Sequence, residues 1–259
     1  MFTKSLHAIS DNEAKFIKVM FILFSDIMNI KILHLLEGAK QAKGLTVIID
    51  VFRAFSVASF VLANGAERII PIGDLSLAYK LKEENPDFIL IGEREGKPQK
   101  GFEYGNSPFE IKNVNFKGKT VIQTTSSGTQ GIANAKNADE IIAGNFTTAN
   151  AIITCIKKKN PEQVSLVGMG HSLKTIAAED LACAKYIKNA LEKNESYNNI
   201  KKIKEKLKED PTYKRFVDPN ITWVPEEDFE LCLDINRFNF IIKAELYKEG
   251  LVQLKKCIV

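Results

Sequence analysis

Short apolar runs rich in β-branched residues alternate with amphipathic stretches of helical length along most of the chain. Runs such as Val47-Ile48-Ile49 and Ile89-Leu90-Ile91 are continuous rather than alternating, which is typical of strands buried on both faces. The pattern predicts strands at 29–36, 46–52, 68–73, 87–92, 120–125, 140–145 and 164–170. It predicts helices between several of them, at 56–65, 75–85, 129–139 and 147–160.

The alternation of strand and helix predicts an α/β fold. We expect three layers, α/β/α, with a mostly parallel or mixed sheet, helices on both of its faces, and a ligand site outside the carboxyl ends of the strands. From Thr175 onward the pattern becomes mainly helical, so a more helical C-terminal part should pack on the sheet or cap the cleft. Segment 92–108, with four glycines and two prolines, predicts a long loop, and such loops are often functional.

The length and composition of the chain suit one domain. With 259 residues and 45% hydrophobic content, it can form one large core, and we assign residues 28–259 to a single α/β domain. Residues 1–27 contain basic residues before a short apolar run, without a small-residue cleavage site. We interpret them as an appended extension, or as sequence before a start at Met28, and leave them outside the predicted fold.

The charge and the cysteines exclude several classes of protein. The net charge of +4 accompanies a lysine-rich stretch, Lys193–Lys214, interspersed with Glu205 and Glu209, which favours a solvated helix over a nucleic-acid-binding surface. No run of eighteen or more apolar residues is present, which argues against a membrane span. The four cysteines form no C-x-x-C pair, so we expect neither a zinc ribbon nor a disulfide framework. We expect the protein to lie in a reducing cytoplasm.

The first candidate site residues are Asp50 and Arg53, where a predicted strand passes into a helix. A carboxylate at this edge can hold a hard cation such as Mg²⁺, and a guanidinium matches the oxygens of phosphate or sulfonate. The alternative is an aspartate that caps the helix and pairs locally with the arginine.

The turn after strand 120–125 carries Ser126, Ser127, Gly128 and Thr129 next to Thr125. Small hydroxyl residues with glycine can bring backbone N–H groups close to an anion at a helix N-terminus. This turn is therefore a candidate cradle for a phosphoryl or carboxylate group, although ordinary helix capping explains the same residues equally well.

Segment 92–108 supplies a third group of candidates. Glu93 could complete a metal shell or position water, Arg94 could bind an anionic arm of a substrate, and Asn106 and Ser107 could donate hydrogen bonds. A charged surface loop and a glycine-hinged lid are the alternatives.

Paired carboxylates, Glu179 and Asp180, form a fourth candidate group. They could complement the dipole at a helix N-terminus or reach the cleft as metal ligands. His171, just after the preceding strand, is a candidate acid or base, although a lone loop histidine is more often incidental.

The sequence lacks the marks of the common phosphatase classes. It has no Cys-x5-Arg loop and no Walker loop, and Asp50 is followed two positions later by Phe52 rather than by a second aspartate. Three histidines in the chain argue against a histidine-rich two-metal hydrolase. A magnesium-type site made of carboxylates, hydroxyls and arginines remains.

Several segments taken together resemble the 2-phosphosulfolactate phosphatase family. They are VIIDVFRAFS, LANGAERIIPI, GEREGKPQKGFEYGNSP, GKTVIQTTSSGT and AAEDLACA, in the family's order, from about Met28 to at least Ala184. The resemblance implies a Mg²⁺-dependent acid phosphatase that releases sulfolactate, a step of coenzyme M synthesis. The positions that match the family pattern are Asp50, Arg53, Ser56, Glu93, Arg94, Gly105, Asn106, Ser107, Pro108, Thr124, Thr125, Gly128, Thr129, Glu179 and Asp180.

The resemblance also implies roles for these residues. Direct hydrolysis is implied, with a metal neutralising charge on the phosphate while arginines and backbone donors stabilise the transferring group; whether Asp50 is a ligand or a nucleophile stays open. Asp50, Arg53 and Glu93 are the candidate catalytic residues. Mg²⁺ is assigned to Asp50 with Glu93, Glu179 or Asp180. Substrate anions are assigned to Arg53, Arg94 and the turn 124–129, together with Ser56, Asn106 and Ser107.

Four positions depart from the family pattern and keep other readings open. They are Phe55, Glu95, Glu103 and Ser127. A phosphatase for another small phosphorylated hydroxy acid is one alternative, and a non-catalytic anion-binding protein on the same scaffold is another. The expected partner is a small anionic phosphoester, with neither nucleic acid nor membrane, and homo-oligomerisation is left open.

Overall fold

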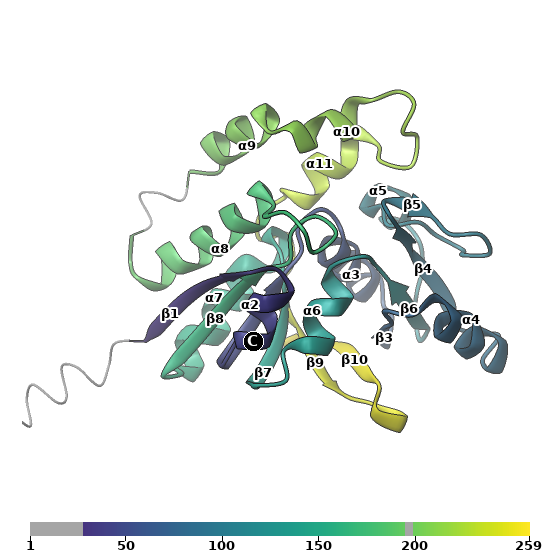
Figure 1. The fold of residues 1–259 in the computed structure, drawn as a ribbon, viewed down its shortest axis with the longest axis horizontal. Coiled ribbons are helices and arrows are strands. Elements are labelled where there is room, and N and C mark those ends of the chain that lie inside the picture. The colour runs from purple at the N-terminus through teal and green to yellow at the C-terminus, as the bar shows by residue number, and fades with distance from the viewer. Residues whose placement is uncertain (1–27, 195–198) are drawn as a thin grey trace, which may run out of the picture.

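The computed structural model describes residues 28–194 and 199–259, so the predicted N-terminal extension lies outside the described residues. Ten strands form one hydrogen-bonded array (Figure 1). They are β1 (Asn29–His34), β2 (Gly44–Ile49), β3 (Arg68–Pro71), β4 (Ile89–Arg94), β5 (Lys97–Pro98), β6 (Thr120–Thr124), β7 (Ala138–Gly144), β8 (Gln163–Gly168), β9 (Phe240–Leu246) and β10 (Val252–Ile258).

Helices cover both faces of this sheet. Those of the described residues are α2 (Leu35–Gln41), α3 (Ala54–Ala63), α4 (Leu75–Glu84), α5 (Pro108–Ile111), α6 (Gly128–Asn134), α7 (Ala149–Lys159), α8 (Ala178–Leu191), α9 (Ile200–Glu209), α10 (Lys214–Val217) and α11 (Glu226–Cys232). Side chains of α2, α3 and α6 pack on one face, and those of α4, α7 and α8 pack on the other. The predicted three-layer α/β/α fold with a mixed sheet is confirmed.

The strand order is β1-β8-β2-β7-β9-β10-β3-β6-β4-β5. The strands β1, β8, β2 and β7 form one parallel block, and β3, β6 and β4 form another. The antiparallel strands β9 and β10 join the two blocks. The register between β10 and β3 consists of one residue pair, Leu254 with Ile69.

The prediction of a mainly helical C-terminal part was incomplete, because β9 and β10 lie in the middle of the sheet. Charged residues such as Lys243 and Lys255 interrupt their apolar pattern. Both lysines are only partly buried, so these strands lack the continuous apolar run that marks a strand buried on both faces.

The twist of the sheet brings the carboxyl ends of the two blocks together. Three antiparallel pairings separate β7 from β3, so the blocks run in opposite senses through the strand order. Five strand-to-strand steps lead from β2 to β6, and a usual twist accumulates about 100–125° over them. The strands of the two blocks therefore cross, and the residues that follow β2 and β6 meet.

Segment 92–108 contains more regular structure than the predicted loop. Strand β4 runs on to Arg94, and β5 pairs back on it with Arg94 opposite Lys97. The two turn residues Glu95 and Gly96 have φ of 54° and 76°, which is the requirement of a two-residue I′ hairpin turn. The segment is therefore a short hairpin followed by irregular chain up to α5.

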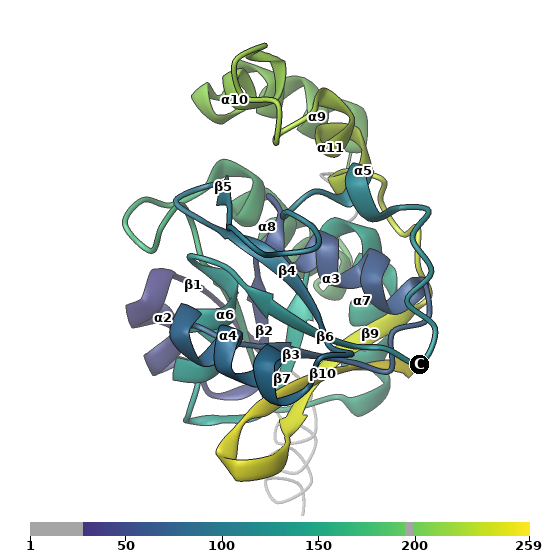
Figure 2. The ribbon, with the colours of Figure 1, turned by 90° about the vertical axis from the view of Figure 1, so that its right-hand side faces the viewer.

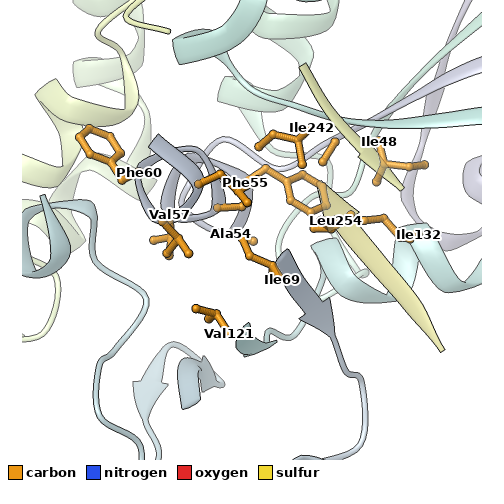
Figure 3. Close-up of a cluster of buried hydrophobic side chains, with 14 of the residues drawn as sticks. Ile48, Ala54, Phe55, Val57, Phe60, Ile69, Val121, Ile132, Ile242 and Leu254 are labelled. Carbon is orange, nitrogen blue, oxygen red and sulfur yellow. The ribbon is translucent and has the colours of Figure 1, made fainter. Parts of the chain in front are cut away.

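Helix α3 fixes the position of the residues that precede it. Its residues Ala54 to Leu62 are all buried, as expected for a helix that is apolar on every side. Figure 3 shows Phe55 of this helix beside the strand side chains of Ile242 and Leu254. Phe60 lies on the other side of the helix, where its ring packs edge-on against Phe238. Burial of each phenylalanine contributes about 2–3 kcal/mol, so the start of α3 is held firmly against the sheet.

The helices α9, α10 and α11 gather beyond one end of the sheet, at the top of both ribbon views (Figures 1 and 2). Within the described residues of the lysine-rich stretch predicted as one solvated helix, α9 covers Ile200–Glu209 and a 3-10 helix covers Pro211–Tyr213. In the described part of the chain, no helix is long and apolar enough to cross a membrane.

Candidate active site

A cavity of about 330 Å³ lies where the chain leaves β2, β4, β6 and β8, with the C-terminal segment around α10 closing one side. A cavity therefore lies at the carboxyl ends of strands, where the ligand site is predicted. The lining residues are Asp50, Phe52, Arg53, Glu93, Glu95, Gly96, Lys97, Asn106, Thr125, Ser126, Ser127, Gly170, His171, Ser172, Arg215, Ile221 and Trp223.

Asp50 follows β2 directly and lines the cavity while being only 7% exposed. Its Oδ1 accepts a hydrogen bond of 3.1 Å from the amide of Ala54, and the Gly128 amide also bonds to it. Burial raises the pKa of Asp50 well above its usual value, and the charges of Asp180 and Glu93 raise the pKa further. Neutralisation of this carboxylate by a cation would therefore be strongly favoured.

The capping alternative required an ion pair between Asp50 and Arg53. Arg53 instead pairs with another carboxylate. Its Nη1 donates 2.5 Å to Oδ2 of Asp228 and 2.9 Å to the carbonyl oxygen of Trp223. The side chain is 5% exposed and lines the cavity. With one end of the guanidinium anchored, the other N–H donors are free to meet an anion in a fixed orientation.

Asp228, on α11, is the anchor of Arg53. It is fully buried, and its Oδ1 accepts hydrogen bonds of 2.8 Å from the hydroxyl of Ser107 and from the amide of Phe109. Burial raises the pKa of Asp228, although the charge of Arg53 opposes this shift. One carboxylate thus connects α11, the start of α5 and the turn after β2.

The amides of the turn after β6 bind protein carboxylates. Glu93 Oε1 accepts 2.7 Å from the Ser126 amide, and Glu93 Oε2 accepts from the Ser126 hydroxyl and the Gly96 amide. The Gly128 amide bonds to Asp50, and a Cβ at Gly128 would lie 2.9 Å from Asp50 Oδ2. The predicted anion cradle is therefore corrected at these positions, since the Ser126 and Gly128 amides orient carboxylates.

Glu179 and Asp180 lie side by side behind the cavity wall and are 2% and 3% exposed. Asp180 accepts 2.9 Å from the Val51 amide and 2.8 Å from the Gly170 amide, so it ties the ends of β2 and β8 together. Glu179 Oε2 is buried without a hydrogen-bond partner among the described residues. Burial, and next the charge of Asp180, raise the pKa of Glu179 well above its usual value.

His171, given above as a candidate acid or base, lines the cavity. Its Nε2 lies 3.1 Å from Thr212 Oγ1 and 3.9 Å from Glu179 Oε1. Partial burial, followed by the positive charge of Arg215, lowers the pKa of His171. The imidazole is therefore mainly neutral near pH 7.

Arg94 points away from the cavity, contrary to the predicted contact with a substrate anion. Its Nη2 donates 2.5 Å to the Gly73 carbonyl oxygen and also donates to Thr124 Oγ1, whose own hydroxyl donates to the Ile72 carbonyl. Neither Arg94 nor Thr124 lines the cavity. Neighbouring residues of a strand face opposite sides, so Glu93 and Arg94 cannot both face the cavity.

Three further predicted substrate contacts are also replaced by contacts within the protein. The Ser56 hydroxyl is fully buried and donates 2.8 Å to the Val51 carbonyl oxygen. The Thr129 hydroxyl donates 3.0 Å to the Thr125 carbonyl oxygen. Ser107, bonded to Asp228 as described, does not line this cavity either.

The remaining predicted residues meet at the cavity. Thr125, Ser126 and Ser127 line it beside Asp50, together with Asn106. The buried Oδ1 of Asn106 has no hydrogen-bond partner among the described residues.

Sequence reasoning missed Lys97, Arg215, Trp223 and Asp228. A signal existed for Asp228, because Asp228 and Cys232 are four residues apart and share one face of α11. An acid on such an apolar face requires a buried partner. Arg215 follows a stretch whose other cations are lysines, and an arginine there favours a specific contact.

We expect the buried carboxylates to make the metal-free protein less stable as the pH rises. Burial raises the pKa of Asp180 from an ordinary 3.8 to about 6. The folded state then binds more protons than the unfolded state between these values, so the free energy of unfolding falls across this window, by about 3 kcal/mol from this group alone. Denaturant unfolding between pH 4 and 7 measures the slope.

Asp180→Asn should flatten this slope, whereas Asp139→Asn, at an exposed aspartate, should leave it unchanged. Equal slopes in the wild type and in Asp180→Asn would contradict the assignment of the pH dependence to this carboxylate.

Comparison with known proteins identifies the family of this chain. The family model described as 2-phosphosulpholactate phosphatase matches residues 31–246. The chain belongs to that family. The match runs from β1 to the end of β9 and includes every residue that lines the cavity, so the earlier resemblance to this family is confirmed.

Curated members of the 2-phosphosulpholactate phosphatase family align over most of their length. A protein of Clostridium acetobutylicum is 33% identical over 212 residues, which cover 76% of this chain and 88% of that protein. One of Thermotoga maritima is 31% identical over 75% of this chain and 86% of its own. One of Bacillus subtilis is 29% identical over 78% and 87%. Each is named a probable 2-phosphosulfolactate phosphatase.

Two of the four departures from the family pattern affect the cavity. Glu95 and Ser127 line it. Phe55 lies fully buried in α3, and Glu103 forms an ion pair with Lys82 away from the cavity. Of these four positions, Glu95 and Ser127 are therefore the ones that lie at the cavity.

Proposed function

We propose that this protein is a Mg²⁺-dependent phosphatase that hydrolyses 2-phosphosulfolactate to sulfolactate and inorganic phosphate. The observation that carries the proposal is that Asp50, Glu93 and Arg53 line one cavity, within a chain of this family. The cavity has about 330 Å³, which is at the small end of ligand pockets and suits a compact substrate.

The acidic residues at the cavity fit a magnesium ion shared between protein and substrate. In the described part of the chain, no three His, Cys, Asp or Glu side chains are gathered so that they alone could hold a metal. Mg²⁺ is commonly held by one or two carboxylates together with phosphate oxygens and water. Asp50 suits this arrangement best because it lines the cavity. Glu179, which lies behind the wall, is the second candidate because its Oε2 has no partner among the described residues, whereas Glu93 and Asp180 use their carboxylates to bind amides.

The protein side chains have distinct roles in the proposed hydrolysis. When bound, Mg²⁺ would neutralise charge on the phosphoryl oxygens. Asp50 is held by the amides of Ala54 and Gly128 and would face the phosphoryl group. Arg53, anchored by Asp228, would donate to the equatorial oxygens, where charge is spread in the transition state. Glu93, fixed by Ser126, would position the attacking water.

A phosphatase for another small phosphorylated hydroxy acid is the second candidate. The observation that favours it is the placement of two departures from the family pattern, Glu95 and Ser127, on the cavity wall. A negatively charged Glu95 would disfavour a highly charged substrate. Comparison of kcat/KM for 2-phosphosulfolactate, phospholactate and phosphoglycolate decides between the two candidates.

Release of inorganic phosphate from 2-phosphosulfolactate tests the proposal directly. We expect turnover with Mg²⁺ and a loss of at least about 100-fold with a chelator, because the metal contributes several kcal/mol of charge stabilisation. Re-addition of Mg²⁺ should restore the rate. Silence toward a panel of phosphoesters, with and without Mg²⁺, would support the non-catalytic anion-binding alternative instead.

We also propose that the reaction takes place in the cytoplasm, as a step of coenzyme M synthesis. The four cysteines are unpaired, and three of them are buried, which suits a reducing compartment.

A further inference from the structure

Arg215 reaches the cavity from the C-terminal segment that closes it. It lies on α10, 162 residues beyond Arg53 in the chain, and both guanidinium groups line the same cavity. Its Nη2 passes so close to Gly96, in the hairpin turn, that a Cβ at Gly96 would lie 2.6 Å away. Arg215 therefore extends over the turn of the β4–β5 hairpin towards the groups that follow the strands.

Within residues 28–194 and 199–259, the cationic groups of Arg215 and Lys97 have no protein partner. Among the described residues, neither forms an ion pair or donates a side-chain hydrogen bond, whereas Arg53 is paired with Asp228. Arg215 and Lys97 are both exposed residues of the cavity wall. Burial of part of the guanidinium, and next the positive charge of Arg53, lower the pKa of Arg215, while the charges of Glu93 and Glu179 oppose this shift. An unpaired guanidinium beside a second guanidinium, on the wall of a cavity, is an arrangement that an anion would stabilise.

Two basic groups of the cavity come from other elements than Asp50 and Arg53, although the acid Glu95 also lies on the wall, two residues before Lys97. Asp50 and Glu93 follow β2 and end β4, and the phosphoryl group is proposed to bind there. Arg215 and Lys97 come from α10 and from the β5 side of the hairpin. A substrate that carries a second anion could therefore have it bound by these two cations while its phosphoryl group faces Asp50 and Arg53.

We propose that Arg215, with Lys97 beside it, binds an oxyanion of the substrate that is not transferred, a carboxylate or a sulfonate. This rests on the proposed function and assigns a second-anion subsite within that cavity. A guanidinium presents a planar fork of N–H donors that matches such oxyanions. Loss of one charge-assisted interaction should weaken binding about 10- to 100-fold.

A nested series of esters separates the second anion from the phosphate. 2-Phosphosulfolactate carries a carboxylate and a sulfonate, phospholactate lacks the sulfonate, and isopropyl phosphate lacks both. We expect Arg215→Met to lower kcat/KM for 2-phosphosulfolactate about 10- to 100-fold, mainly through KM, and to leave kcat/KM for isopropyl phosphate within about threefold. An equal loss for phospholactate assigns Arg215 to the carboxylate, and a loss confined to 2-phosphosulfolactate assigns it to the sulfonate.

Binding of sulfolactate provides a readout that does not depend on hydrolysis. This product has both oxyanions but no phosphoryl group, and calorimetry should show a Kd about 10- to 100-fold higher for Arg215→Met than for the wild type. Lys214→Met is the matched control, because Lys214 is the exposed neighbour on α10 and does not line the cavity; it should change neither Kd nor kcat/KM.

Two results would overturn the subsite. One is unchanged sulfolactate binding in Arg215→Met, and the other is a loss of kcat/KM that is the same for all three esters. Failure of the wild type to release phosphate from any ester would instead contradict the proposed function, and the sulfolactate measurement would still decide whether Arg215 binds an oxyanion.

Discussion

Asp50→Asn should lower kcat for phosphate release about 10³-fold, comparable to the loss of a major electrostatic group from an active site. The substitution removes the carboxylate charge that is proposed to face the phosphoryl group and the metal. An asparagine oxygen can still accept the amide hydrogen bond of Ala54, which measures 3.1 Å in the aspartate. The local structure after β2 should therefore be retained.

Stability should change in the opposite direction to activity in this variant. Burial and the neighbouring carboxylates raise the pKa of Asp50, so its charge destabilises the metal-free protein at pH 8, and the Tm of Asp50→Asn should be no lower than that of the wild type. The stabilisation that Mg²⁺ adds to the wild type should be lost. Asp87→Asn, at an exposed aspartate before β4, is the control for both measurements. Near-normal turnover, or an unfolded variant, would contradict the role given to Asp50.

Asp228→Ala should reduce the free energy of unfolding by about 3–5 kcal/mol, the usual cost of leaving one partner of a buried ion pair alone. The guanidinium of Arg53, 5% exposed, would lose its only ion-pair partner among the described residues. The Ser107 hydroxyl and the Phe109 amide would lose their acceptor as well. Activity should fall too, because Arg53 would no longer be held in one orientation.

A double variant separates these two effects. Arg53→Met with Asp228→Leu replaces the buried pair by apolar side chains, and such replacements are often neutral or stabilising. We expect the double variant to recover most of the lost unfolding free energy in denaturant titrations and to remain inactive. If Asp228→Ala alone costs less than about 1 kcal/mol, as a surface pair would, Asp228 does not anchor Arg53 in solution.

Most of the sheet could be predicted from the sequence, because seven of its strands carry continuous or nearly continuous apolar runs. The strands β9 and β10 could not, since Lys243 and Lys255 are partly buried on the sheet and give the segment a mixed pattern. The opposite directions of the two parallel blocks follow from the pairing of these two strands. The relative direction of the blocks therefore could not be predicted from the sequence either.

The candidate site was predictable where it depends on strand ends. Asp50, Glu93 and the turn after β6 were found because polar residues directly follow apolar runs. The direction of Arg94 could have been inferred from strand alternation, but only with the knowledge that β4 continues to that residue. Asp228 lies 175 residues from Arg53, and no local pattern reveals a pairing at that separation.

The antiparallel strands β9 and β10, which join the two parallel blocks, matter when the activity of a homologue is inferred from its sequence. Every residue that lines the cavity precedes Phe240, and the family match ends at residue 246, before β10 begins at Val252. A homologue could thus retain each reactive group and still lack the terminal hairpin that couples the two half-sheets. The presence of all active-site residues in a homologue therefore does not establish activity unless the β9–β10 hairpin, which sets their spacing, is also present.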